Sequence, residues 1–146
     1  MEDLIQLAYA VDTFYFLIMG AMVMFMAPGF AMLEAGMVQS KNTSEILTKN
    51  VALFSIACVM YLLVGYDIMY GGGVLLSAEN TVDDVLASGG DVYYAARSDF
   101  FFQVVFVATA MSIISGAVAE RMKLWSFLLF AVVMTGVIYP YQGEWK

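Results

Sequence analysis

The sequence predicts an all-α membrane protein in which four transmembrane helices form a single domain over residues 1–146. Hydrophobic residues make up 62% of the chain and charged residues 13%, a ratio typical of helical membrane proteins rather than of soluble ones. Three runs of twenty residues, 14–33, 100–119 and 124–143, contain no charge. At ~1.5 Å of rise per residue, a helix of that length spans the hydrocarbon core of a bilayer.

The four predicted spans cover approximately residues 13–38, 47–70, 99–120 and 123–143, with an outer loop at 77–98. Within the first span, Pro28 removes a backbone donor and is expected to kink the helix. Pro140, near the end of the fourth span, is expected to mark where the regular helix stops. Glu34 lies near the end of the first span, where a carboxylate either has a function or pairs locally near the inner interface. Its position alone favours local pairing.

The second span is predicted to end at an acidic loop. Asp67 falls near the outer end of this span and is expected to be a solvated interface residue. The glycines at 71–73 are expected to end the helix. The acidic residues of the following stretch are Glu79, Asp83, Asp84, Asp91 and Asp99. Such a loop can raise the local concentration of cations, although acidic loops are more often simply solvated.

The third span separates into two faces at helical spacing. One face carries Phe102, Phe106, Thr109 and Ile113, and the other carries Ala108, Ser112, Ser115 and Ala119. Small residues let helix backbones approach closely in lipid, so the small face is predicted to pack in the helix bundle. The two phenylalanines are predicted to form a wall or plug near the outer end. From spacing alone, such a pair is more often ordinary core packing.

Charge and side-chain chemistry argue against several classes of function. The net charge of −7 argues against nucleic acid as a partner. The chain has one cysteine, Cys58, and no histidine, so no metal site and no cofactor are expected. No nucleophile–base pair can be assembled, so no catalytic residue is assigned and the protein is not expected to be an enzyme. Glu2 and Asp3 stand where a secretory signal would be basic, so no cleavable signal peptide is expected.

The distribution of basic residues predicts the orientation in the membrane. The linkers after the first and third spans carry Lys41, Lys49, Arg121 and Lys123, whereas the other side carries Arg97 and Lys146. Basic linkers stay on the cytoplasmic side of a membrane. We therefore expect a multi-pass protein of the cell (inner or plasma) membrane with its N-terminus, acidic loop and C-terminal end outside.

Three segments of the sequence carry a resemblance to a known family. They are GFAMLEAGMVQSKN (29–42), FFQVVFVATAMSIISGAVAERMKLW (101–125) and YPYQGEWK (139–146). Together they resemble the N-terminal part of the ammonium transporter family, whose relatives include the Rhesus proteins. The resemblance covers nearly the whole chain.

The resemblance implies a fold, a substrate and partners. The family's subunits have about eleven helices in two inverted halves, each subunit has its own pore, and three subunits form a homotrimer. Ammonium enters through an outer vestibule of aromatic rings and then meets two stacked phenylalanines, below which paired histidines line the pore. The implied partners are ammonium or ammonia, the lipid bilayer and a PII-type regulatory protein on the cytoplasmic side.

By position in the motif, Phe106 matches the phenylalanine of the vestibule and gate. Phe102 sits one turn above it toward the outside, and Gln103 beside it is a candidate hydrogen-bond tether. These three residues are the predicted substrate-binding residues.

The sequence also departs from the family pattern. The matching vestibule tryptophan is expected directly after Lys146 rather than at Trp145, so it is absent from this sequence. A supporting aspartate and the pore histidines of the family are absent as well. The chain is therefore expected to be an N-terminal fragment that does not transport alone. Two alternatives stay open: a membrane ammonium sensor of the same fold, and a non-conducting four-helix membrane scaffold.

Overall fold

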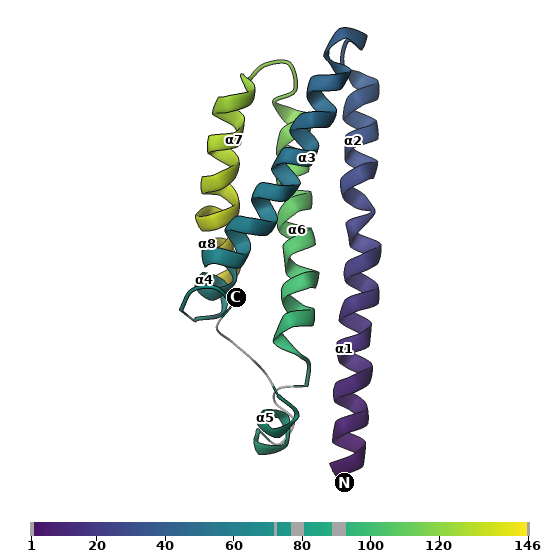
Figure 1. Cartoon of the computed structure of the whole chain (residues 1–146), viewed down its shortest axis with the longest axis vertical. Helices are drawn as coiled ribbons and strands as arrows, with labels where there is room; N and C mark the ends of the chain where they lie inside the picture. The colour runs from purple at the N-terminus through teal and green to yellow at the C-terminus, as the bar shows by residue number, and fades with distance from the viewer. Residues whose placement is uncertain (1, 72, 77–80, 89–92, 146) are drawn as a thin grey trace.

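The computed structural model describes residues 2–71, 73–76, 81–88 and 93–145, and all regular secondary structure within them is helical (Figure 1). By length and composition, four helical segments of this part are able to cross a membrane. They are Asp3–Met37, Ser40–Tyr70, Ala96–Ala117 and Leu124–Glu144. The prediction of an all-α protein with four transmembrane helices is therefore confirmed.

The first segment consists of two helices, α1 (Glu2–Met24) and α2 (Met26–Met37), with a break at Phe25. The Phe25 amide donates to the Met22 carbonyl over 3.2 Å, one residue closer along the chain than in a regular α-helix. Pro28 lies three residues beyond the break and has no N–H to continue the hydrogen-bond ladder. The helix is thus interrupted close to Pro28, and helix α1 begins well before residue 13.

The second segment changes its helical type three times. A 3₁₀ turn, Ser40–Asn42, leads into α3 (Thr43–Met60), which is followed by a π-helical turn, Tyr61–Gly65, and by α4 (Tyr66–Tyr70). The helix ends at Gly71, whose φ of +75° is unfavourable for other residues. The prediction that glycine ends this helix is confirmed.

Residues 77–98 are not a simple loop. They contain the short helix α5 (Val82–Ala87), which Thr81 and Asp84 start with a reciprocal capping box. The hydrogen bonds from the backbone and side chain of Thr81 hold the pKa of the Asp84 carboxyl below its usual value. Residues 96–98 already belong to α6. The expected acidic residues at 79 and 91 lie outside the described residues.

The third and fourth segments are α6 (Ala96–Ala117) and a composite helix. The composite consists of α7 (Leu124–Val133), a π-helical turn, Met134–Ile138, and α8 (Tyr139–Glu144). The prediction that the regular helix stops at Pro140 is wrong. Pro140 occupies the first turn of α8, where a missing N–H is tolerated, and the wider π-helical turn precedes it.

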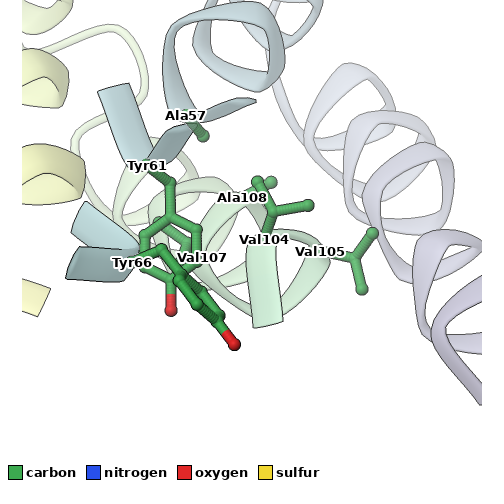
Figure 2. Close-up of a cluster of buried hydrophobic side chains, with 7 residues drawn as sticks. All are labelled: Ala57, Tyr61, Tyr66, Val104, Val105, Val107 and Ala108. Atoms are coloured by element: carbon green, nitrogen blue, oxygen red, sulfur yellow. The ribbon is translucent and has the colours of Figure 1, made fainter. Parts of the chain in front are cut away.

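Helix α6 packs against α1, α2 and α3, and α3 crosses it and also packs against α7 (Figure 1). Three members of its predicted small face, Ala108, Ser112 and Ser115, are fully or almost fully buried, so they form a packing face. The fourth, Ala119, lies beyond the end of α6 and is only partly buried. Figure 2 shows one cluster of the resulting core, in which Ala57, Tyr61, Tyr66, Val104, Val105, Val107 and Ala108 lie together. The hydroxyls of Tyr61 and Tyr66 point the same way in this view.

The outer surface of the bundle is apolar. Phe25 on the first segment is 77% exposed and Trp125 on α7 is 82% exposed. Exposed apolar side chains also continue along most of α1. A soluble protein rarely exposes such continuous apolar surface, whereas a lipid-facing surface requires it.

Candidate functional site

The three predicted site residues line one hollow of about 370 Å³. It lies toward the end of the bundle that carries the N-terminus and α5, which we call the α5 end (Figure 1). Residues from α4, α6 and α8 form its wall. They are Met69, Phe102, Gln103, Phe106, Tyr139, Gln142 and Gly143.

Two phenylalanine rings of α6 form the aromatic part of this wall. Phe102 and Phe106 are one helical turn apart, with ring centroids separated by 5.0 Å and planes at 70°. The ring of Phe102 also lies 5.3 Å from that of Phe16 on α1, at 77°. Edge-to-face contacts of this kind fix ring positions and leave faces available to a cation.

A polar network that is buried at Tyr66 and Asp99 and exposed at Tyr70 adjoins the wall. The Nε2 atom of Gln103 donates to the Tyr70 hydroxyl over 3.0 Å and lies 3.4 Å from Oδ1 of Asp99. The Tyr66 hydroxyl donates to Oδ2 of Asp99 over 3.0 Å. Only 2% of the Asp99 surface is exposed, so a carboxylate stands behind an amide that lines the hollow.

The expectation of solvated carboxylates at Asp67 and Asp99 is wrong, because both are buried, at 3% and 2% exposure. Asp99 lies in the first turn of α6 and accepts a hydrogen bond from Tyr66 of α4, which is more than thirty residues away in the sequence. The one local signal for its burial is its spacing, four residues before Gln103, which places both on one side of a helix.

Sequence reasoning did not single out Met69, Tyr139 and Gln142. The last two lie in the segment 139–146, whose pattern carried part of the family resemblance. Helix α8 brings Tyr139 and Gln142 to the hollow only because the chain continues past Pro140 as a helix.

A second polar cluster lies at the opposite end of the bundle, which we call the turn end. The carboxylate of Glu34 accepts hydrogen bonds from Lys49 Nζ at 2.5 Å, from Asn50 Nδ2 at 2.9 Å and from Ser115 Oγ at 2.9 Å. Lys49 also reaches the Ser115 carbonyl at 3.2 Å and lies 5.0 Å from the centre of the Phe127 ring. Glu34 is therefore paired, but with residues of two other segments rather than locally, and the pair is buried.

Glu120 joins the two turns at this end. Its Oε1 atom accepts from Asn42 Nδ2 at 2.7 Å and from the Gln39 amide at 3.0 Å. These hydrogen bonds, together with the nearby charge of Lys41, hold the pKa of the Glu120 carboxyl below its usual value. Its backbone has a φ of +61°, which is uncommon for glutamate.

The chemistry available at the hollow is that of rings, amides and a buried carboxylate. Among the described residues, no group of three or more His, Cys, Asp or Glu side chains is placed to hold a metal ion. Aromatic rings beside an amide and a carboxylate are groups that can attract a small cation.

Comparisons with known proteins agree on one family. The sequence profile described as Ammonium Transporter Family matches residues 14–146. The putative ammonium transporter sll1017 of Synechocystis sp. is 37% identical over 97% of this chain and 33% of its own length. Ammonium transporter Amt2 of Methanocaldococcus jannaschii is 36% identical over 99% of this chain and 35% of its own length. The chain thus spans about a third of the length of these relatives.

Proposed function

Because the chain belongs to the ammonium transporter family, we propose that its hollow is part of the entry site of a protein that moves ammonium or ammonia across a membrane. The observation that carries this proposal is the convergence of Phe102, Gln103 and Phe106 on one hollow. The transport reaction itself belongs to the whole protein, of which these residues supply one wall.

The physics of the hollow suits ammonium. The ion is small and loses hydration when it enters a confined space, so the site must replace water with other favourable contacts. Aromatic faces such as those of Phe102 and Phe106 attract cations electrostatically, and the carboxamide of Gln103 supplies hydrogen-bonding atoms. No basic residue lines the hollow among the described residues, so nothing there repels a cation.

The charge distribution supports an outward-facing hollow in a cell membrane. Described acidic side chains such as Asp3, Asp83 and Asp84 lie at the α5 end, whereas Lys41, Lys123 and Arg121 lie at the turn end. By the positive-inside rule, this distribution favours an orientation with the N-terminus and the hollow outside. The family also supports a homotrimeric whole protein and a PII-type regulatory partner on the cytoplasmic side, and both are parts of this proposal.

Uptake measurements test the proposal. The full-length product of the gene that encodes this chain is expressed in cells without ammonium transporters of their own, and radiolabelled methylammonium uptake is measured. Phe106→Ala is expected to reduce uptake at low substrate concentration about tenfold, the effect of losing a desolvated cation–π contact. The matched control is Phe14→Ala, a substitution of an exposed phenylalanine on α1, which should change uptake less than twofold.

Three results would contradict parts of the proposal. Unchanged uptake and unchanged affinity in Phe106→Ala would remove this residue from the site. Ammonium binding without uptake above the empty-vector level would favour the sensor alternative. If neither binding nor uptake is detected in the correctly inserted full-length protein, the scaffold alternative is favoured.

A further inference from the structure

We propose that Asp99 is a positioning residue for cation recognition, which orients the Gln103 carboxamide so that its Oε1 atom is the acceptor offered to an ammonium N–H. This inference rests on the proposed function and assigns a role to a residue behind the wall of the hollow. It names a hydrogen-bond acceptor beside the aromatic rings and the group that fixes its direction.

The neighbours of Gln103 determine which way its amide points. A carboxylate can only accept hydrogen bonds, so Oδ1 of Asp99 requires the NH₂ group of Gln103 on its side. The Tyr70 hydroxyl accepts a hydrogen bond from the same Nε2 atom over 3.0 Å. Asp99 therefore selects the orientation in which Nε2 faces Tyr70 and Asp99, and Tyr70 is compatible with it.

The opposite atom of the amide is then available to the hollow. Within the part of the chain that the structure describes, no hydrogen bond to Oε1 of Gln103 is formed, and the residue lines the hollow. An amide held with its NH₂ group toward the hollow would present hydrogens to a cation, whereas this orientation presents an oxygen. The direction of one amide thus decides whether the wall attracts or repels ammonium beside the two rings.

The surrounding network holds the Asp99 carboxyl in place. The Tyr66 hydroxyl occupies Oδ2 at 3.0 Å, and Gln103 approaches Oδ1. A buried carboxylate is unfavourable without such donors. The ring of Tyr66 lies 4.7 Å from that of Tyr70. Tyr66 is 3% exposed and belongs to the core cluster, so its hydroxyl is held by packing (Figure 2).

The test is a double-mutant cycle on the full-length protein, with the apparent KM and the maximal rate of uptake measured separately. Asp99→Asn introduces an NH₂ group that can bond Oε1 and turn the Gln103 amide around. Asp99→Asn and Gln103→Leu are each expected to raise the apparent KM for ammonium about tenfold, with the maximal rate within about threefold. Because Asp99 acts through Gln103, the double variant should have the KM of Gln103→Leu alone.

A selectivity measurement separates this role from a structural one. Methylammonium can place its methyl group on the rings and depends less on one acceptor, so both substitutions should lower the preference for ammonium over methylammonium. Tyr70→Phe removes only the hydroxyl that receives Nε2 and should shift KM in the same direction by a smaller factor. The matched control, Asp83→Asn, removes an exposed carboxylate at the α5 end and should leave KM unchanged.

The outcomes distinguish this inference from the proposed function. If the wild type takes up ammonium and Phe106→Ala impairs it, but Asp99→Asn and Tyr70→Phe leave KM and selectivity unchanged, only this inference is overturned. Additive KM effects in the double variant would overturn it too, because Asp99 would then act by its charge alone. If the inserted wild type shows no ammonium uptake, the proposed function fails, and this inference fails with it.

Discussion

The carboxylate of Glu34 joins three of the four candidate spans, and its partner Lys49 reaches the fourth. Glu34 lies on α2, Lys49 and Asn50 lie on α3, and Ser115 lies on α6. Lys49 completes the set by lying over the ring of Phe127 on α7. Removing two charges from water is costly, and the surrounding hydrogen bonds are what make the buried pair tolerable.

At the scale of this residue pair, we predict that Lys49→Met destabilises the folded protein by about 3–5 kcal/mol, because Glu34 keeps a buried charge without its counter-charge. The double variant Glu34→Gln with Lys49→Met should be more stable than Lys49→Met, since no unpaired charge remains. Thermal unfolding of purified protein in detergent micelles measures both effects.

The control for this prediction is Lys41→Met, which changes an exposed lysine of the same turn region and should stay within about 0.5 kcal/mol of the wild type. Equal unfolding temperatures for Lys41→Met and Lys49→Met would show that the buried pair contributes nothing to stability.

At the scale of elements, the two π-helical turns of the second and fourth segments pack against each other. They are Tyr61–Gly65 and Met134–Ile138, and they contact each other directly. A Cβ atom on Gly65 would lie 2.4 Å from Cδ2 of the Tyr61 ring and 3.1 Å from Cγ of Pro140. Glycine at this position is what lets the second and fourth segments approach so closely.

We therefore predict that Gly65→Ala destabilises the protein by about 1–3 kcal/mol, the usual cost of overfilling a packed interior. A tyrosine ring and a proline cannot move aside as a flexible side chain can. Gly29→Ala is the matched control, since a Cβ there meets no atom within 4 Å, and replacing a helical glycine by alanine stabilises a helix by up to ~1 kcal/mol. Unfolding temperatures that fall equally in both variants would contradict this explanation.

The sequence was sufficient to predict the helices but not all their interruptions. Long uncharged runs reflect the thickness of a bilayer, so the spans could be found from composition alone. Pro28 and Pro140 had similar local signals, yet the first follows a break and the second begins a helix after a π-helical turn. A π-helical turn depends on packing between segments, and a single sequence carries little sign of it.

The candidate site was predictable only where it follows a helix face. Phe102, Gln103 and Phe106 lie within five residues of each other, so their common side could be read from helical spacing. The burial of Asp99 depends on Tyr66 and Tyr70, which reach it from another helix. Contacts of that kind require the tertiary structure, and this is why Asp99 was expected to be solvated.

At the scale of the whole molecule, the two ends of the bundle have different roles. The segments 29–42 and 101–125, which carry much of the family resemblance, meet at the turn end through Glu34 with Ser115 and Asn42 with Glu120. The hollow is at the other end. Part of the family signature therefore reflects the assembly of the helices rather than contact with the substrate.

The proposed orientation makes a prediction for the whole molecule. In a Cys58→Ala background, a cysteine at position 83 should react with a membrane-impermeant maleimide added to intact cells, and a cysteine at position 123 should react only after the cells are opened. Both positions are exposed in the structure. The reverse pattern of labelling would place the hollow on the cytoplasmic side.

The unequal lengths of the helices have a consequence for the membrane around them. The first segment has 35 residues and α6 has 22, which at ~1.5 Å per residue is about 52 Å and about 33 Å. Only the shorter length matches a hydrocarbon layer of ~30 Å. Helix α6 then sets the depth at which the protein sits, whereas the first segment has surplus length that tilting or protrusion can absorb. We expect α1 to fit thicker bilayers, because its surplus length can absorb the change, whereas α6 has no surplus length. A change in lipid chain length would therefore affect α6, the helix that carries Phe106.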